Sequence, residues 1–184
     1  NASTGQFGLS LIAYDARSPN DELTTVTLVQ SGLSNLPAHP YHELAANLGG
    51  ALLLRGYLVD AAEAGQTIQM PASRKLNVTI DTQSLRPIYV NLKLFVHLRG
   101  PDGREWPQQD VTLGGDSRPT GSWQPGETAR QTVMLSLPPD APVGEYSMVA
   151  GVYDPDTSRR LAALDPSGAS AGDSVSFGRI VVGS

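Results

Sequence analysis

Apolar and polar residues alternate one by one over several short segments of this chain. Three segments show the alternation most clearly, with apolar faces formed by Leu76, Val78 and Ile80; by Val90, Leu92, Leu94, Val96 and Leu98; and by Tyr146, Met148, Ala150 and Val152. Successive side chains of a β-strand point to opposite faces, so a period of two predicts strands with one buried face. Such a sheet needs a second layer to cover that face.

Further strands are expected between turns rich in Gly, Pro and Asp, at residues 7–14, 23–30, 51–59, 67–70, 104–106, 129–137, 159–164 and 175–182. Residues 42–48 are compatible with one or two helical turns, and no long helix is expected. The sequence therefore predicts an all-β protein: a two-layer, immunoglobulin-like antiparallel β-sandwich of about 8–10 strands with at most one short helix.

The second face of the segment 88–98 is half polar. Its members are Tyr89, Asn91, Lys93, Phe95 and His97. Since one face of an antiparallel sheet is often solvated, we expect these residues on the outer face of the sheet, in contact with water or a ligand.

Composition limits the classes of function. The 184 residues fit a single domain spanning 1–184. The net charge of −5, with 13 scattered basic residues, disfavours binding to nucleic acid or anionic lipid. No apolar run approaches the ~20 residues of a membrane helix, so direct insertion of this chain is not expected. The absence of cysteine excludes disulfides, thiolate catalysis and zinc–cysteine sites.

No catalytic constellation, metal site or cofactor site is predicted. The segment 39–43 holds two histidines and a glutamate, but their spacing and Pro40 do not fit a zinc protease motif. Asp154-Pro155-Asp156 has the Asp-x-Asp form used for divalent metals, yet it ends a strand and is typical of a turn.

Aromatic side chains are the main candidates for a ligand site, because sugar-binding sandwiches stack pyranose rings on aromatic groups. Two tryptophans follow the segment 88–98, with charged residues close by in sequence. The candidate ligand-binding residues are Trp106, Trp123, Tyr89, Phe95, His97, Asp116 and Arg118. The structural alternative is that Trp123 caps the open end of the core and Phe95 packs under a loop.

Several short motifs occur in a characteristic order: Leu54-Arg55-Gly56-Tyr57, Phe95-Val96-His97-Leu98, Pro125-Gly126-Glu127, Pro142-Val143-Gly144-Glu145-Tyr146 and Gly151-Val152-Tyr153-Asp154. In this order the chain resembles the β-sandwich domain at the extracytoplasmic C-terminus of bacterial polytopic membrane proteins. Many of those proteins are similar to dolichyl-phosphate-mannose-type glycosyltransferases of the C-superfamily. The resemblance covers about residues 50–183, and residues 1–48 are expected to be added N-terminal strands and a connection. One departure is Asp81-Thr82, where the family usually has a Trp.

The resemblance implies a noncatalytic, extracytoplasmic accessory domain of a bacterial membrane glycosyltransferase-like protein. The catalytic carboxylates of that family lie in its membrane portion, so none is carried over. The implied partners are a glycan or lipid-linked sugar and the membrane domain of the parent, through which this piece would be tethered. The chain starts without Met, which fits a piece of a longer protein. Alternatives are a structural spacer or protein–protein interaction module, and an independent metal-dependent hydrolase or transferase that uses Asp154, Asp156 and the histidines.

Overall fold

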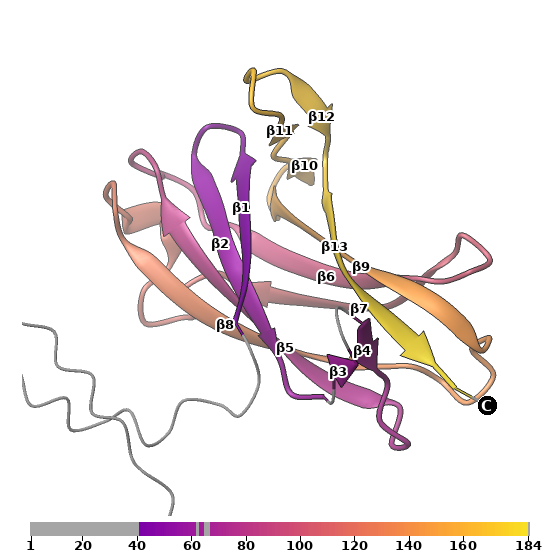
Figure 1. Cartoon of the computed structure of the whole chain (residues 1–184). Coiled ribbons are helices and arrows are strands. Elements are labelled where there is room, and N and C mark those ends of the chain that lie inside the picture. Colours follow the sequence, from indigo (N-terminus) through magenta and orange to yellow (C-terminus); the bar gives the residue numbers. More distant parts are fainter. Residues whose placement is uncertain (1–40, 62, 65–66, 184) are drawn as a thin grey trace, which may run out of the picture. The chain divides into compact units, whose positions relative to one another are not determined.

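Two stacked β-sheets make up the described part of the chain, which in this computed structural model is residues 41–61, 63–64 and 67–183 (Figure 1). The strands expected at 7–14 and 23–30, and His39, lie outside these residues. Six strands form one sheet, in the order β12 (Ser170–Gly172), β11 (Ala163–Leu164), β1 (His42–Leu48), β2 (Leu52–Val59), β5 (Lys75–Ser84) and β8 (Thr128–Ser136).

The other sheet has seven strands. Its order is β3 (Glu63–Ala64), β4 (Thr67–Gln69), β13 (Val175–Val182), β9 (Gly144–Asp154), β6 (Lys93–Arg99) and β7 (Glu105–Thr112), with β10 (Arg159–Arg160) paired to β9. A single 3₁₀ turn, η2 (Thr120–Ser122), is the only helical element in the described ranges. In Figure 1 the segment carrying β10, β11 and β12 lies at the top of the view.

The predicted all-β sandwich is confirmed. Eight of the 13 described strands have seven or more residues, which accounts for the expected range, and the other five have only two or three. All pairings are antiparallel except that of β4 with β13, which is parallel. No helix in the described ranges has the length and apolar character needed to cross a bilayer.

The core lies between the two sheets and follows the predicted alternation. All four inward residues of the central strand β9 are fully buried: Tyr146, Met148, Ala150 and Val152. From the opposite sheet, the inward residues of β5, namely Leu76, Val78 and Ile80, are equally enclosed. A period of two, read from sequence, therefore identifies the buried face of both layers.

Residues 42–48 form strand β1, and the expected helical turns are wrong. β1 pairs with β2 on one side and with β11 on the other. Its register shifts between Glu43 and Ala46, where Ala45 has a positive φ of 51°. Glu, Leu and Ala favour a helix locally, but pairing on both edges and burial of Leu48 outweigh that weak preference.

The segment 88–98 becomes a strand only from Lys93 onward, and Val90 is not a core residue, since it is 46% exposed. The hydroxyl of Thr120 explains this start. It accepts a 2.7 Å hydrogen bond from the Leu92 N–H and donates one of 2.8 Å to the Val90 carbonyl. A side chain thus satisfies backbone groups that a neighbouring strand would otherwise pair.

Candidate functional site

A pocket of about 180 Å³ opens on the outer face of the seven-stranded sheet. Its walls come from β6, β7, β9, β10 and the turn after β9. The lining residues are Phe95, His97, Asp110, Tyr153, Ser158 and Arg160. Two of the residues predicted from sequence, Phe95 and His97, therefore meet in one pocket.

The ring of Phe95 forms the base of this pocket. It lies across Gly151 on the neighbouring strand, where an added Cβ would overlap the ring and approach the Asp173 carbonyl to 2.9 Å. The guanidinium carbon of Arg160 lies 4.5 Å from the centroid of the ring. Phe95 is consequently only 2% exposed although it lies on the outer face, so neighbouring side chains cover its ring.

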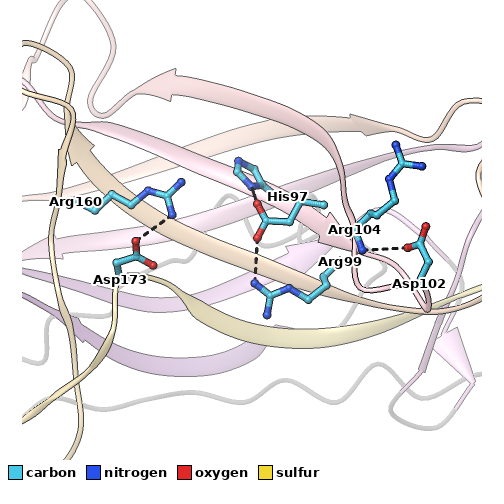
Figure 2. Close-up of polar contacts among 7 residues, drawn as sticks. His97, Arg99, Asp102, Arg104, Arg160 and Asp173 are labelled. Atoms are coloured by element: carbon cyan, nitrogen blue, oxygen red, sulfur yellow. Dashed lines mark hydrogen bonds and ion pairs between the residues drawn. The ribbon is translucent and has the colours of Figure 1, made fainter.

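Arg160 is held over Phe95 by two interactions. Besides the contact of its cation with the ring, its Nη1 lies 3.1 Å from Oδ2 of Asp173 (Figure 2). The two side chains are 41% and 57% exposed, so solvent screens the ion pair. The arginine therefore covers the aromatic base while most of its N–H groups stay accessible to a ligand.

The ion pair between Glu105 and Arg99 holds the ring of His97 in place. Its Nδ1 lies 3.0 Å from Oε2 of Glu105, and Nη2 of Arg99 lies 3.0 Å from Oε1 of the same carboxylate (Figure 2). Hydrogen bonds from Arg99, and then from His97, lower the pKa of Glu105. His97 is only 3% exposed, and its ring lies 4.8 Å from that of Phe95. The imidazole is thus oriented before any ligand arrives.

Asp110 and Tyr153 also line the pocket and are bonded to each other. The Tyr153 hydroxyl donates a 2.8 Å hydrogen bond to Oδ2 of Asp110, and this bond, which favours the neutral phenol, raises the pKa of Tyr153. Asp110 is the cross-strand partner of Phe95. The carboxylate and the guanidinium of Arg160 therefore approach Phe95 from opposite sides.

The Asp154-Pro155-Asp156 segment is a turn. Oδ1 of Asp154 accepts from the Asp156 N–H at 2.9 Å, and Oδ2 accepts from the Thr157 hydroxyl at 2.8 Å. The hydrogen bond from Thr157, and then that from Asp156, lower the pKa of Asp154. They shape the loop that presents Ser158, whose φ is +57°, at the pocket. Within the part of the chain that the structure describes, no three His, Asp or Glu side chains gather as a metal site would require.

Trp123 lies in the hydrophobic core between the two sheets and not in the pocket on the outer face. It is 1% exposed, and its indole N–H donates a 2.9 Å hydrogen bond to the Arg118 carbonyl. Tyr89, by contrast, is 82% exposed. Asp116 and Arg118 are exposed on the loop before Trp123, and Arg118 pairs with Glu127 at 3.0 Å. These predicted candidates do not line the pocket.

Trp106 lies toward the opposite end of β6, where it pairs with Leu98. It is half-buried against the core, and its Nε1 lies 3.3 Å from Oδ1 of Asp102 in the β6–β7 turn. The guanidinium carbon of Arg104 is 4.8 Å from its ring. Figure 2 shows Arg104 and Asp102 together at this turn, with His97 drawn between them and Arg160. The seven candidates are therefore divided among three places.

Sequence reasoning missed four of the lining residues, Asp110, Tyr153, Ser158 and Arg160, as members of one site. One usable signal was present, because Tyr153 and Gly151 share the outer face of the strand by their spacing. Asp110 and Arg160 reach that face because β7 pairs with β6, and β10 pairs with β9, in a particular register. Alternation along a single strand carries no information about this.

A second pocket, of about 240 Å³, lies on the six-stranded sheet. It is lined by Leu58, Val59, Asp60, Asn77, Thr79, Arg130 and Thr132. Most of its polar side chains are bonded in pairs: Asp60 with Asn77, Thr79 with Thr132, and Arg130 with Asp81. Among the described residues, no aromatic side chain lines this pocket, whereas the pocket around Phe95 combines aromatic rings with an acid and a guanidinium and is therefore the stronger candidate for a sugar site.

No protein-family model matches this chain, and no curated protein matches it. Solved structures with a similar arrangement include the C-terminal domain of Wzt (13% identity, 81% of each chain covered, TM-score 0.48). Others are a Niemann-Pick type C2 protein from the Japanese carpenter ant (7%, 77% of this chain and 98% of that one, 0.43) and the CARDB domain of PF1109 from Pyrococcus furiosus in complex with di-metal ions (17%, 82% and 97%, 0.34). At these values the likeness supports no conclusion about function, and the site is interpreted from its own residues.

Proposed function

We propose that this chain is a noncatalytic accessory domain that binds carbohydrate in the pocket around Phe95. The observation that carries the proposal is the meeting of Asp110 and Arg160 over an aromatic base in an open pocket of about 180 Å³. Sugars present hydroxyls that both donate and accept, and a carboxylate and a guanidinium lining one pocket match both roles. The volume is below the ~300 Å³ of pockets for drug-sized ligands, which suits a single sugar ring.

Binding is tested by calorimetric titration of the full chain with a panel of methyl glycosides and short polyprenyl-linked sugars. We expect saturable binding at millimolar ligand or below, and its loss in Asp110→Ala and Arg160→Ala. Thr132→Ala, in the pocket of the six-stranded sheet, serves as the control and should bind normally. If no sugar binds at millimolar concentration, the proposal is wrong.

We also propose that the domain belongs to a bacterial membrane glycosyltransferase-like protein and lies on the extracytoplasmic side, tethered to its membrane domain. The ordered motifs at residues 50–183 support this. The sequence contains two lysines, Lys75 and Lys93, and Lys75 is exposed. An amine reagent that cannot cross membranes should label this domain of the full-length gene product in intact cells. Labelling that appears only after lysis would contradict the proposed location.

A protein–protein interaction module or spacer is the second candidate. It is favoured by three exposed apolar side chains in the connection from β5 to β6: Leu85, Tyr89 and Val90, which are 41%, 82% and 46% exposed. This function predicts that substitutions at these positions weaken association with the parent protein while sugar binding, if present, is unaffected. Pull-down of the separately expressed membrane portion by wild type and by a Tyr89→Ser/Val90→Ser variant distinguishes the two.

A further inference from the structure

The polar groups around Phe95 select between classes of sugar. Asp110 contributes a carboxylate with one oxygen already engaged by the Tyr153 hydroxyl. Because that hydroxyl donates to Asp110, the phenolic oxygen faces a ligand only as an acceptor. Acceptors thus dominate on the side of the pocket where the Tyr153 hydroxyl meets Asp110.

Donors come from the opposite wall. Arg160 has five N–H groups, and one of its terminal nitrogens is engaged by Asp173. Ser158, an exposed residue that also lines the pocket, adds a hydroxyl. A ligand therefore meets donors on one side and acceptors on the other, across the Phe95 ring.

The charges in the pocket argue against an acidic ligand. The positive charge of Arg160 is offset by Asp173 at 3.1 Å, and Asp110, which among the described residues is bonded to the Tyr153 hydroxyl and to no cation, adds a further negative charge. On the His97 side, Glu105 is balanced by Arg99 at 3.0 Å. A carboxylate or phosphate on the ligand would compete with Asp173 for the arginine and be repelled by Asp110.

We infer that the pocket binds a neutral sugar through two adjacent hydroxyls, one donating to Asp110 and the other accepting from Arg160, and discriminates against sugar acids and sugar phosphates. This inference rests on the proposed carbohydrate-binding function. Adjacent hydroxyls on a pyranose suit this arrangement because each both donates and accepts, whereas a carboxylate only accepts.

The test compares ligands with the same ring but different charge. Methyl glucoside, its uronic acid counterpart and glucose 1-phosphate, and the corresponding mannose and galactose series, are titrated into the full chain. The neutral member of the series that binds is expected to bind at least ten-fold tighter than its acid. Removal of either hydroxyl of the diol, with singly deoxygenated glycosides, is expected to abolish measurable binding.

Variants test which side chains cause the preference for the neutral glycoside over its acid. Asp110→Asn keeps the shape of the side chain and removes its charge, so the neutral glycoside should bind about ten-fold more weakly and the preference over the acid should shrink or vanish. Arg160→Gln should weaken the neutral glycoside similarly. Asp116→Asn, which removes an exposed carboxylate outside the pocket, should change neither value. Circular dichroism confirms that each variant is folded.

The outcomes separate the two proposals. Tighter or equal binding of the acid overturns the neutral-diol inference and leaves carbohydrate binding standing. Binding of the neutral glycoside that is insensitive to Asp110→Asn and Arg160→Gln also overturns the inference, because the sugar then binds elsewhere. Binding of neither class removes the proposed function itself.

Discussion

The hydroxyl of Tyr146 donates a 2.7 Å hydrogen bond to the carbonyl oxygen of Pro142, four residues earlier. Tyr146 is fully buried near the start of the central strand β9, and its partner lies in the Pro-rich turn that leads into the strand. A tyrosine whose hydroxyl bonds back to the backbone just before its strand is the tyrosine corner of immunoglobulin-like sandwiches. The bond fixes how the chain enters β9, on which both the core and the Phe95 pocket depend.

Tyr146→Phe should therefore lower the free energy of unfolding by about 1 kcal/mol, because the Pro142 carbonyl loses its donor. Burial also raises the pKa of Tyr146 above its ordinary value, so the folded protein keeps a proton that the unfolded chain gives up at alkaline pH. The advantage of wild type over the variant is full below pH 10 and should fall as the pH rises through the folded pKa. Urea titrations between pH 7 and 11 measure both effects.

Tyr89→Phe is the matched control, since Tyr89 is 82% exposed. The change should stay within about 0.5 kcal/mol at neutral pH. Equal losses in the two variants would show that the Tyr146–Pro142 bond contributes nothing particular to stability.

Glu105 links His97 to Arg99 and predicts an acid-dependent loss of stability. Its pKa is lowered mainly by the hydrogen bond from Arg99 and then by that from His97. A depressed folded pKa contributes stability that is present above the unfolded value of about 4.5 and is lost as pH falls through the folded value. Glu105→Gln should thus be less stable than wild type by about 1 kcal/mol or less at pH 7, with the gap closing at low pH.

Denaturant unfolding from pH 7 to pH 3 measures this gap. Glu145→Gln is the control, because its contact with Arg179 is 3.7 Å long and both side chains are more than half exposed. Its stability should differ little from wild type across the same range. A gap for Glu105→Gln that persists unchanged at pH 3 would contradict the ionic origin of the effect.

Trp106 and Trp123 should differ in solvent access and in their contribution to the free energy of unfolding. Trp123 is 1% exposed with its N–H bonded, whereas Trp106 is half-buried beside a turn. Trp123→Ala is expected to cost about 3–5 kcal/mol, and Trp106→Ala clearly less. In Trp106→Phe the remaining emission should be blue-shifted and resist acrylamide. Readily quenched emission from Trp123 would contradict its placement in the core.

The inward face of the sandwich was predictable because a single physical rule determines it. Tyr146, Met148, Ala150 and Val152 alternate with outward residues, and the requirement that apolar side chains be covered leaves one arrangement of the strand. Strand β1 was missed since its local sequence favours a helix and only pairing with β2 and β11 decides otherwise.

The candidate site was predictable only in part. Phe95 and His97 share an outer face by their spacing, which a sequence shows directly. Asp110 and Arg160 join them through cross-strand pairs, Phe95 with Asp110 and Tyr153 with Arg160. Register across strands depends on contacts between residues distant in the chain, which local alternation does not encode. Burial of Phe95 likewise follows from Arg160, which lies over its ring.

Glutamine side chains cap the edges where the two sheets meet. β7 and β8 are edge strands of different sheets, and the Gln109 amide oxygen accepts a 2.7 Å hydrogen bond from the Met134 N–H of β8. In return, Gln131 of β8 donates to the Thr112 carbonyl of β7 at 2.7 Å. Unpaired edge groups are templates for pairing with another chain, so these amides block such association.

Gln109→Ala/Gln131→Ala should accordingly expose a strand edge. We expect concentration-dependent association in sedimentation velocity, together with a loss of about 1 kcal/mol for each hydrogen bond removed. Gln83→Ala is the control, because Gln83 lies on β5, which is paired on both sides, and this variant should sediment like wild type at every concentration. A double variant that sediments as wild type does, while losing the expected stability, would mean that the glutamines hold the two sheets together without protecting their edges.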